Sequence, residues 1–108
     1  MAARVKSLKL SEAEFTTQVI SYARLRGWLA FHARPARTSK GWRTALQGDA
    51  GFPDLVLVRE SSLIFAELKV GKNQLTEAQR RWTTRLSNAA YTFVWTPADW
   101  PEIEKVLR

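Results

Sequence analysis

Three residues have the types and spacing to do chemistry together: the acids Asp54 and Glu67 and the amine Lys69. Two carboxylates held close together repel each other and resist joint ionisation unless a cation lies between them. A divalent metal ion would serve, because hard oxygen ligands suit Mg²⁺ and a bound metal can acidify water and act as a Lewis acid. Lys69 itself would also serve, in a surface salt-bridge cluster that performs no chemistry. The residue types alone leave both interpretations open.

A predicted β-hairpin brings the three residues together. Residues 55–58 and 63–66 are short apolar runs, and the polar residues between them are typical of a tight turn. A turn centred between residues 60 and 61 places Asp54 opposite Glu67, with the Cβ atoms roughly 4.5–5.5 Å apart. Lys69 lies two residues beyond Glu67 and therefore projects from the same face. We expect the two carboxylates to be close enough to hold one divalent ion.

The order of residue types in this hairpin is also distinctive. Pro53-Asp54 is followed, after twelve residues, by Glu67-Leu68-Lys69. This order resembles the core of the PD-(D/E)xK phosphodiesterases. The resemblance implies that the acids bind Mg²⁺ or Mn²⁺, and that the lysine orients the attacking water and stabilises the charge developing on the phosphate.

Length and composition restrict the class of protein. A chain of 108 residues is predicted to form one domain with a core of its own, here residues 11–108 after a basic arm at residues 1–10. The absence of cysteine and the single histidine exclude disulfides and nearly exclude a zinc site of the usual kind. No apolar run is long enough for a membrane span, and the N-terminus lacks the apolar region of a signal peptide. We therefore expect a cytoplasmic protein.

The charge balance favours a polyanionic partner. Lys and Arg number 17 against 10 Asp and Glu, which gives a net charge of +7. On so small a domain this excess indicates nucleic acid as the simplest partner. The alternative is a basic, soluble protein that binds no nucleic acid.

Many of the basic residues lie in a polar, irregular stretch, residues 34–50, which is predicted to be a long loop. Basic residues recur there at intervals of three, with Trp42 among them, and this suits a strip that contacts phosphates and stacks on an unpaired base. The alternative is a solvated loop with Trp42 folded onto the core. The residues predicted to bind nucleic acid are Arg34, Arg37, Lys40, Arg43 and, after the hairpin, Lys72.

Helices and two further strands are predicted around the hairpin. Apolar residues recur at near-helical spacing over residues 11–26 and 76–89, and residues 99–107 are predicted to form a short terminal helix. Residues 28–33 and 91–95 are predicted strands. The coarse order is αβββαβα, which is a mixed α/β fold.

Glu14 and Gln79 each stand three residues after a predicted helix N-cap, Ser11 and Thr76. This is the spacing of the capping box, in which the third helical side chain returns to the backbone N–H of the cap. The alternative for Glu14 is that it points toward the two hairpin acids as a further metal ligand.

The wider constellation resembles the VRR-NUC (virus-type replication-repair nuclease) domain, whose pattern includes G-x-PD-L, E-x-K and a helix opening with L-S/T-x-x-Q. The matching stretches are Ser11-x-x-Glu14, Gly51-Phe52-Pro53-Asp54-Leu55, Glu67-Leu68-Lys69 and Leu75-Thr76-x-x-Gln79. They span nearly the whole chain, as in a stand-alone member of the type found in phages and bacteria. The resemblance implies a restriction-endonuclease-like PD-(D/E)xK core, αβββαβ with a short C-terminal helix.

Carried over by position, the resemblance implies a catalytic set made of Asp54, Glu67, Lys69, Glu14 and Gln79. The three acids would bind Mg²⁺ or Mn²⁺, Lys69 would be the catalytic amine, and Gln79 would help near the metal or the water. The resemblance further implies a structure-specific DNA endonuclease that acts on branched DNA such as Holliday junctions.

The same resemblance implies a homodimer. The aromatic segment 95–100 is the surface that we expect to be apolar and exposed for pairing. The competing interpretation of the whole chain is a non-catalytic basic module that binds nucleic acid.

Overall fold

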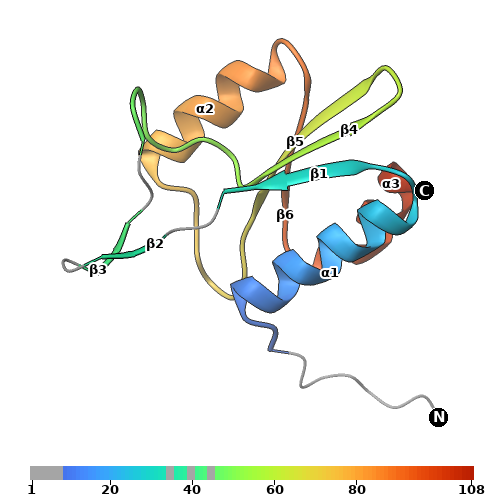
Figure 1. The fold of residues 1–108 in the computed structure, drawn as a ribbon, viewed down its shortest axis with the longest axis horizontal. Helices are drawn as coiled ribbons and strands as arrows, with labels where there is room; N and C mark the ends of the chain where they lie inside the picture. The colour runs from blue at the N-terminus through green and yellow to red at the C-terminus, as the bar shows by residue number, and fades with distance from the viewer. Residues whose placement is uncertain (1–8, 34–35, 39–40, 44–45) are drawn as a thin grey trace.

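The computed structural model describes residues 9–33, 36–38, 41–43 and 46–108, with the backbone alone for 36–38 and 41–43. Figure 1 shows how the elements are arranged. In chain order they are α1 (Glu12–Leu25), β1 (Leu29–His32), β2 (Ala36–Thr38), β3 (Gly41–Arg43), β4 (Leu55–Arg59), β5 (Ser62–Leu68), α2 (Glu77–Ser87), β6 (Tyr91–Trp95), the 3₁₀ helix η1 (Pro97–Asp99) and α3 (Trp100–Leu107).

Four strands form one mixed sheet in the order β1-β4-β5-β6 (Figure 1). The strand β4 pairs antiparallel with β1 and with β5, whereas β6 runs parallel to β5. A parallel pair needs a crossover connection, and α2 supplies it. The β4–β5 ladder pairs Leu55 with Ala66 and Arg59 with Ser62, so the hairpin register predicted from the sequence is confirmed.

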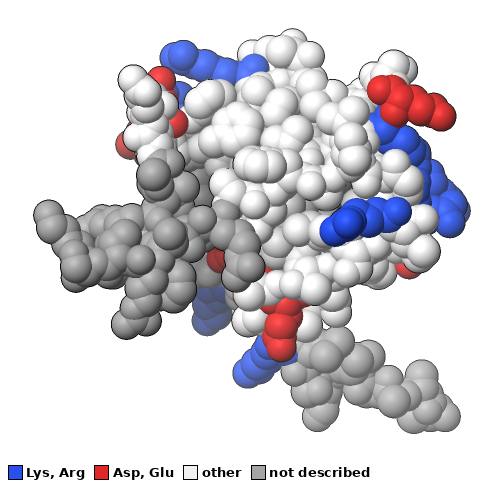
Figure 2. Space-filling view, in the orientation of Figure 1, with Lys and Arg blue, Asp and Glu red and all other residues white. Residues whose placement is uncertain are grey.

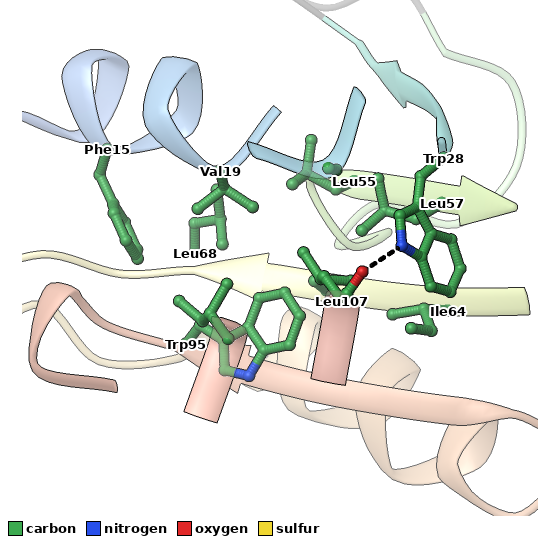
Figure 3. Packing of buried hydrophobic residues seen from close by; sticks show 12 residues of the cluster. Phe15, Val19, Trp28, Leu55, Leu57, Ile64, Leu68, Trp95 and Leu107 are labelled. Carbon is green, nitrogen blue, oxygen red and sulfur yellow. Dashed lines mark hydrogen bonds between the residues drawn. The ribbon is translucent and has the colours of Figure 1, made fainter. Parts of the chain in front are cut away.

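The core lies between the sheet and the helices α1 and α3. Figure 3 shows Phe15 and Val19 of α1 among the sheet residues Leu55, Ile64 and Trp95, and all five are buried. Burying one such side chain contributes about 1.5–3 kcal/mol, so this face of the sheet accounts for much of the stability of the fold.

The helix α2 covers part of the opposite face. Because side chains alternate along a strand, Phe65 of β5 points away from the core residues on either side of it. The ring of Phe52 lies between the ring of Phe65 and that of Trp82 on α2. Its centroid is 5.7 Å from the centroid of Phe65 and 5.0 Å from that of Trp82. The result is an α/β fold of four strands and three helices, compatible with the expected restriction-endonuclease-like core and short C-terminal helix.

The secondary structure differs from the sequence prediction in two places, the stretch 34–50 and the start of the terminal helix. The expected irregular loop at residues 34–50 is wrong in part, because β2 and β3 pair there as a short antiparallel ladder, with Ala36 opposite Arg43. Strands of three residues are too short to show an apolar and polar alternation, so the sequence carries no signal for them. The terminal helix begins at Trp100 rather than residue 99, because the Asp99 carboxylate accepts a bond from the backbone N–H of Thr96 (2.8 Å) and closes η1 first.

The expectation of an exposed aromatic segment at residues 95–100 is wrong. Trp95 is 1% exposed and belongs to the core. Trp100 packs edge-on against Tyr22 of α1, with ring centroids 5.6 Å apart. This segment therefore holds α1 to the sheet and offers little surface for a second copy.

The expected basic arm, residues 1–10, lies outside the described residues except for Lys9 and Leu10. Within the described part of the chain, none of the helices has the length and apolar character needed to cross a membrane.

Candidate active site

The β4–β5 hairpin sets Asp54 against Glu67 where the two strands meet the loops. Continuing the ladder by one pair beyond Leu55 and Ala66 places Asp54 opposite Glu67. One carboxylate oxygen of Asp54, Oδ2, accepts a bond from the backbone N–H of Leu68 (2.9 Å). The side chain of Asp54, which immediately precedes β4, is thus bonded directly to the last residue of β5.

Glu67 is the one acidic side chain among the buried residues of the described chain, at 1% exposed. Its Oε2 atom accepts a bond from Nε2 of Gln79 (2.9 Å) and lies 3.5 Å from Nζ of Lys69. Its Oε1 atom is buried and has no hydrogen-bond partner in the described residues. A buried polar atom without a partner is costly, so this oxygen is suited to a ligand that the protein itself does not supply.

Burial, which is the larger cause, and the negative charge of the neighbouring Asp54 together raise the pKa of Glu67 from 4.5 to about 8, although the positive charge of Lys69 opposes both effects. Without a metal ion the carboxyl group therefore holds a proton at neutral pH. The simple alternative of a surface salt-bridge cluster does not describe this arrangement, because Glu67 is buried and the lysine does not offset the burial.

Lys69 is held at the same end of the sheet by its backbone. Its N–H donates to the carbonyl oxygen of Trp95 (2.9 Å), which continues the β5–β6 pairing past the end of β5. The side chain is 13% exposed, so the amine lies at the border between Glu67 and solvent. A cation in this place can meet an anionic substrate without leaving the site.

The donors fit a hard divalent cation. Asp54 and Glu67 offer carboxylate oxygens, and the partnerless Oε1 of Glu67 is the kind of atom that a cation would satisfy. No third His, Cys, Asp or Glu joins them among the residues that the structure describes. Mg²⁺ is commonly held by one or two carboxylates together with waters and substrate phosphates, so two protein ligands are sufficient.

Gln79 has both of the roles that its position suggested. The carbonyl oxygen of its side chain accepts from the backbone N–H of Thr76 (2.9 Å) and completes the capping box of α2. Its amide nitrogen donates to Glu67. The first turn of α2 therefore fixes the orientation of the buried carboxylate.

Glu14 is placed differently from the expectation that it joins the two hairpin acids. Its carboxylate accepts from the backbone N–H of Ser11 (2.9 Å), and the hydroxyl of Ser11 accepts from the N–H of Glu14 (3.0 Å). The side chain is exposed and closes the capping box of α1. In this structure Glu14 is a cap, and the acid pair of the hairpin is formed without it.

The predicted nucleic-acid contacts are only partly described. Arg37 lies in β2 and Arg43 in β3, whereas Arg34 and Lys40 fall outside the described residues. Lys72 is exposed in the turn that follows β5. The structure gives no side-chain placement for the first four, so their contact with nucleic acid stays a prediction.

One set of positioning contacts was missed from the sequence: those that fasten the loop before Asp54 to α2. Gly51 has a φ of +103°, and a Cβ atom there would lie 2.5 Å from the carbonyl carbon of Ala78. The indole N–H of Trp82 donates to the carbonyl oxygen of Asp49 (3.2 Å). A glycine shortly before the first acid was the available signal, since a close backbone approach needs the absence of a side chain.

The comparison with protein families agrees with this geometry. The model of the VRR-NUC domain matches residues 12–99, which is most of the chain. A search of the curated proteins finds no significant match. The matched segment contains both hairpin acids, the lysine and Gln79. The chain therefore belongs to the VRR-NUC domain family, within the PD-(D/E)xK nuclease superfamily.

Proposed function

We propose that the protein is a metal-dependent, structure-specific DNA endonuclease that hydrolyses phosphodiesters in branched DNA such as Holliday junctions. Membership of the VRR-NUC family supports the coarser part of this proposal, because it indicates a nuclease-type function. The observation that carries the proposal is Glu67: a buried carboxyl group beside Asp54 and Lys69, with one oxygen lacking a partner. A purely structural ion pair does not need that oxygen left unbonded.

In this proposal, different residues position the acids, bind the metal ion and stabilise the developing charge. Leu68, through its N–H, and Gln79, through its amide, hold the carboxylates of Asp54 and Glu67 in place. Bound by these two acids, Mg²⁺ or Mn²⁺ would supply Lewis-acid activation of the phosphate and acidification of a water molecule. Lys69 orients the water that attacks and stabilises the negative charge that develops on the phosphate, which is the largest kind of catalytic contribution available to such a site. Glu14 as a further acid stays part of the proposal, although the structure shows it as a cap.

Branched DNA and a homodimer complete the proposal. The domain carries one candidate site, and symmetric cutting of a four-way junction needs two, so a pair of copies suits that substrate. The net charge of +7 supports a polyanionic partner. Sedimentation with and without a four-way junction would test the dimer directly.

A cleavage panel tests the proposed function. The substrates are a four-way junction, a flap, linear duplex and single-stranded DNA, each with Mg²⁺, with Mn²⁺ and with EDTA. Asp54→Ala, Glu67→Ala and Lys69→Ala should each abolish cutting while DNA binding stays measurable. Glu60→Ala and Lys105→Ala, which change exposed residues of the same types elsewhere, serve as matched controls and should cut normally.

The non-catalytic module is the alternative that this panel rejects or supports. It predicts DNA binding that is unaffected by the three substitutions and no metal-dependent products on any substrate. Cutting that persists in all three variants would instead show that the active site lies elsewhere.

A further inference from the structure

An exposed aromatic side chain lies on the same face of the sheet as the two acids. Phe31 of β1 is 60% exposed, in the middle of a paired strand. It stands opposite Val56, and Val56 is two residues from Asp54, so Phe31, Asp54 and Glu67 share one face. Phe31 is a diagonal neighbour of Asp54 across the β1–β4 ladder, a relation in which the residues are about 7–8 Å apart. Among the described residues, no aromatic ring packs against it.

The surface around Phe31 is apolar and open. Leu29, Val58 and Leu63 continue along the same face in the next row away from the acids, with exposures of 76%, 36% and 40%. Figure 2 shows that the middle of the molecule, between α2 and α1, is largely free of charged side chains. The face thus changes from charged at Asp54, Glu67 and Lys69 to uncharged within one row of the sheet.

Three kinds of partner could pack against the exposed ring of Phe31, and their chemistry distinguishes them. A second copy of the chain seated on this ring would also cover Asp54, the diagonal neighbour, and would close the site to DNA. A duplex backbone carries phosphates and gains nothing from an uncharged ring. The base of an unpaired nucleotide has an apolar π-face, and stacking on an aromatic side chain of a sheet is a common way in which proteins bind such bases.

We propose that Phe31 stacks on an unpaired nucleobase of the DNA strand whose phosphate lies at Asp54, Glu67 and Lys69. The inference rests on the proposed nuclease function and narrows its substrate class within branched DNA: forks and flaps, which carry unpaired bases next to the cleavage point, rather than fully paired four-way junctions. Stacking does not depend on base identity, so this contact selects structure rather than sequence. It brings the strand to the acids at places where base pairing is already broken.

Binding measured without cleavage tests the contact. The probe is a forked DNA with 2-aminopurine at the unpaired position next to the branch, titrated in EDTA and followed by its fluorescence. Phe31→Ala should weaken binding of the fork roughly 5- to 150-fold, the range for the loss of one stacked base, and should abolish the fluorescence change. Binding of a fully paired linear duplex should stay at the wild-type level. Phe31→Trp should restore the fork affinity.

Leu29→Ala is the matched control, because Leu29 is exposed on the same strand and face but one row further from the acids. It should bind the fork as wild type does. Equal weakening by Leu29→Ala and Phe31→Ala, or wild-type binding by Phe31→Ala, would overturn the inference.

The two proposals fail in different ways. A wild-type protein that cuts branched DNA while Phe31→Ala binds and cuts normally refutes the stacking contact alone. A protein that shows the Phe31-dependent fluorescence change in EDTA but cuts nothing with Mg²⁺ refutes the nuclease proposal alone.

Discussion

At the scale of single residues, Glu67 makes the stability of the metal-free protein depend on pH. Its pKa is about 8 in the folded chain, mainly because of burial, against an ordinary value of 4.5. Between these values the unfolded chain loses the proton and the folded chain keeps it, so the free energy of unfolding falls as pH rises. The slope for one group is at most about 1.4 kcal/mol per pH unit, and the loss is complete above pH 8.

We expect Glu67→Gln to remove this loss, because an amide fits the same space and does not ionise. The measurement is the midpoint of thermal unfolding in EDTA from pH 5 to pH 9. The wild-type midpoint should fall more steeply across this range than that of the variant, and Mg²⁺ at pH 8 should raise the midpoint of the wild type only. Parallel pH profiles for the two proteins would contradict the assignment of the buried proton to Glu67.

Glu14 can be separated into its two roles by a substitution that keeps the cap. Glutamine also serves as the third residue of a capping box, so Glu14→Gln should unfold at nearly the wild-type temperature. If Glu14 is also an acid of the site, the same variant should lose metal-dependent cutting. Glu12→Gln, in the same turn and equally exposed, is the control for a general charge effect. Normal cutting by Glu14→Gln would leave Glu14 with capping alone.

At the scale of elements, the loop before Asp54 packs against α2. The position of Asp54 in the site therefore depends on this contact. A Cβ at Gly51 would meet the backbone of Ala78, and a backbone cannot turn aside as a side chain can. We expect Gly51→Ala to lower the free energy of unfolding by about 2–4 kcal/mol and to reduce cutting, since the loop carries Asp54.

Gly48 is the matched control for this substitution. It also has a positive φ, +112°, but no atom lies within 4 Å of where its Cβ would be. Gly48→Ala should therefore show only the conformational cost, roughly 1 kcal/mol, and keep its activity. Chemical denaturation and cleavage rates measured on both variants decide the matter. Equal losses in both would mean that the loop conformation, and not the contact with α2, is responsible.

Features set by neighbouring residues were predictable from the sequence, whereas contacts between distant residues were not. The β4–β5 register was predictable because the turn and the two apolar runs fix it locally, and both capping boxes were predictable because a cap and its partner are three residues apart. The fastening of the loop to α2 joins Gly51 to Ala78 and Asp49 to Trp82, contacts between distant residues that no local pattern encodes. The contact of Glu67 with Gln79 is of the same kind, since the two residues lie twelve positions apart on different elements.

At the scale of the whole molecule, the net charge of +7 should appear in the salt dependence of DNA binding. Each phosphate contact that is lost reduces the slope of log K against log salt by about 0.9 on duplex DNA. We expect the triple substitution Arg37→Gln, Lys40→Gln and Arg43→Gln to weaken binding and to flatten that slope, because these residues are predicted to contact phosphates.

A second triple variant separates local contacts from total charge. Arg24, Arg26 and Lys105 are exposed and lie on α1, just after it, and on α3, and Figure 1 shows this end of the molecule across from the β2–β3 hairpin. Their replacement by Gln removes the same three charges, so it lowers the long-range attraction equally. Because counterions are released only where a phosphate is actually neutralised, its slope should stay near the wild-type value. Two equally flattened slopes would mean that DNA binding depends on the total charge of the domain. Arg37, Lys40 and Arg43 would then make no phosphate contacts of their own.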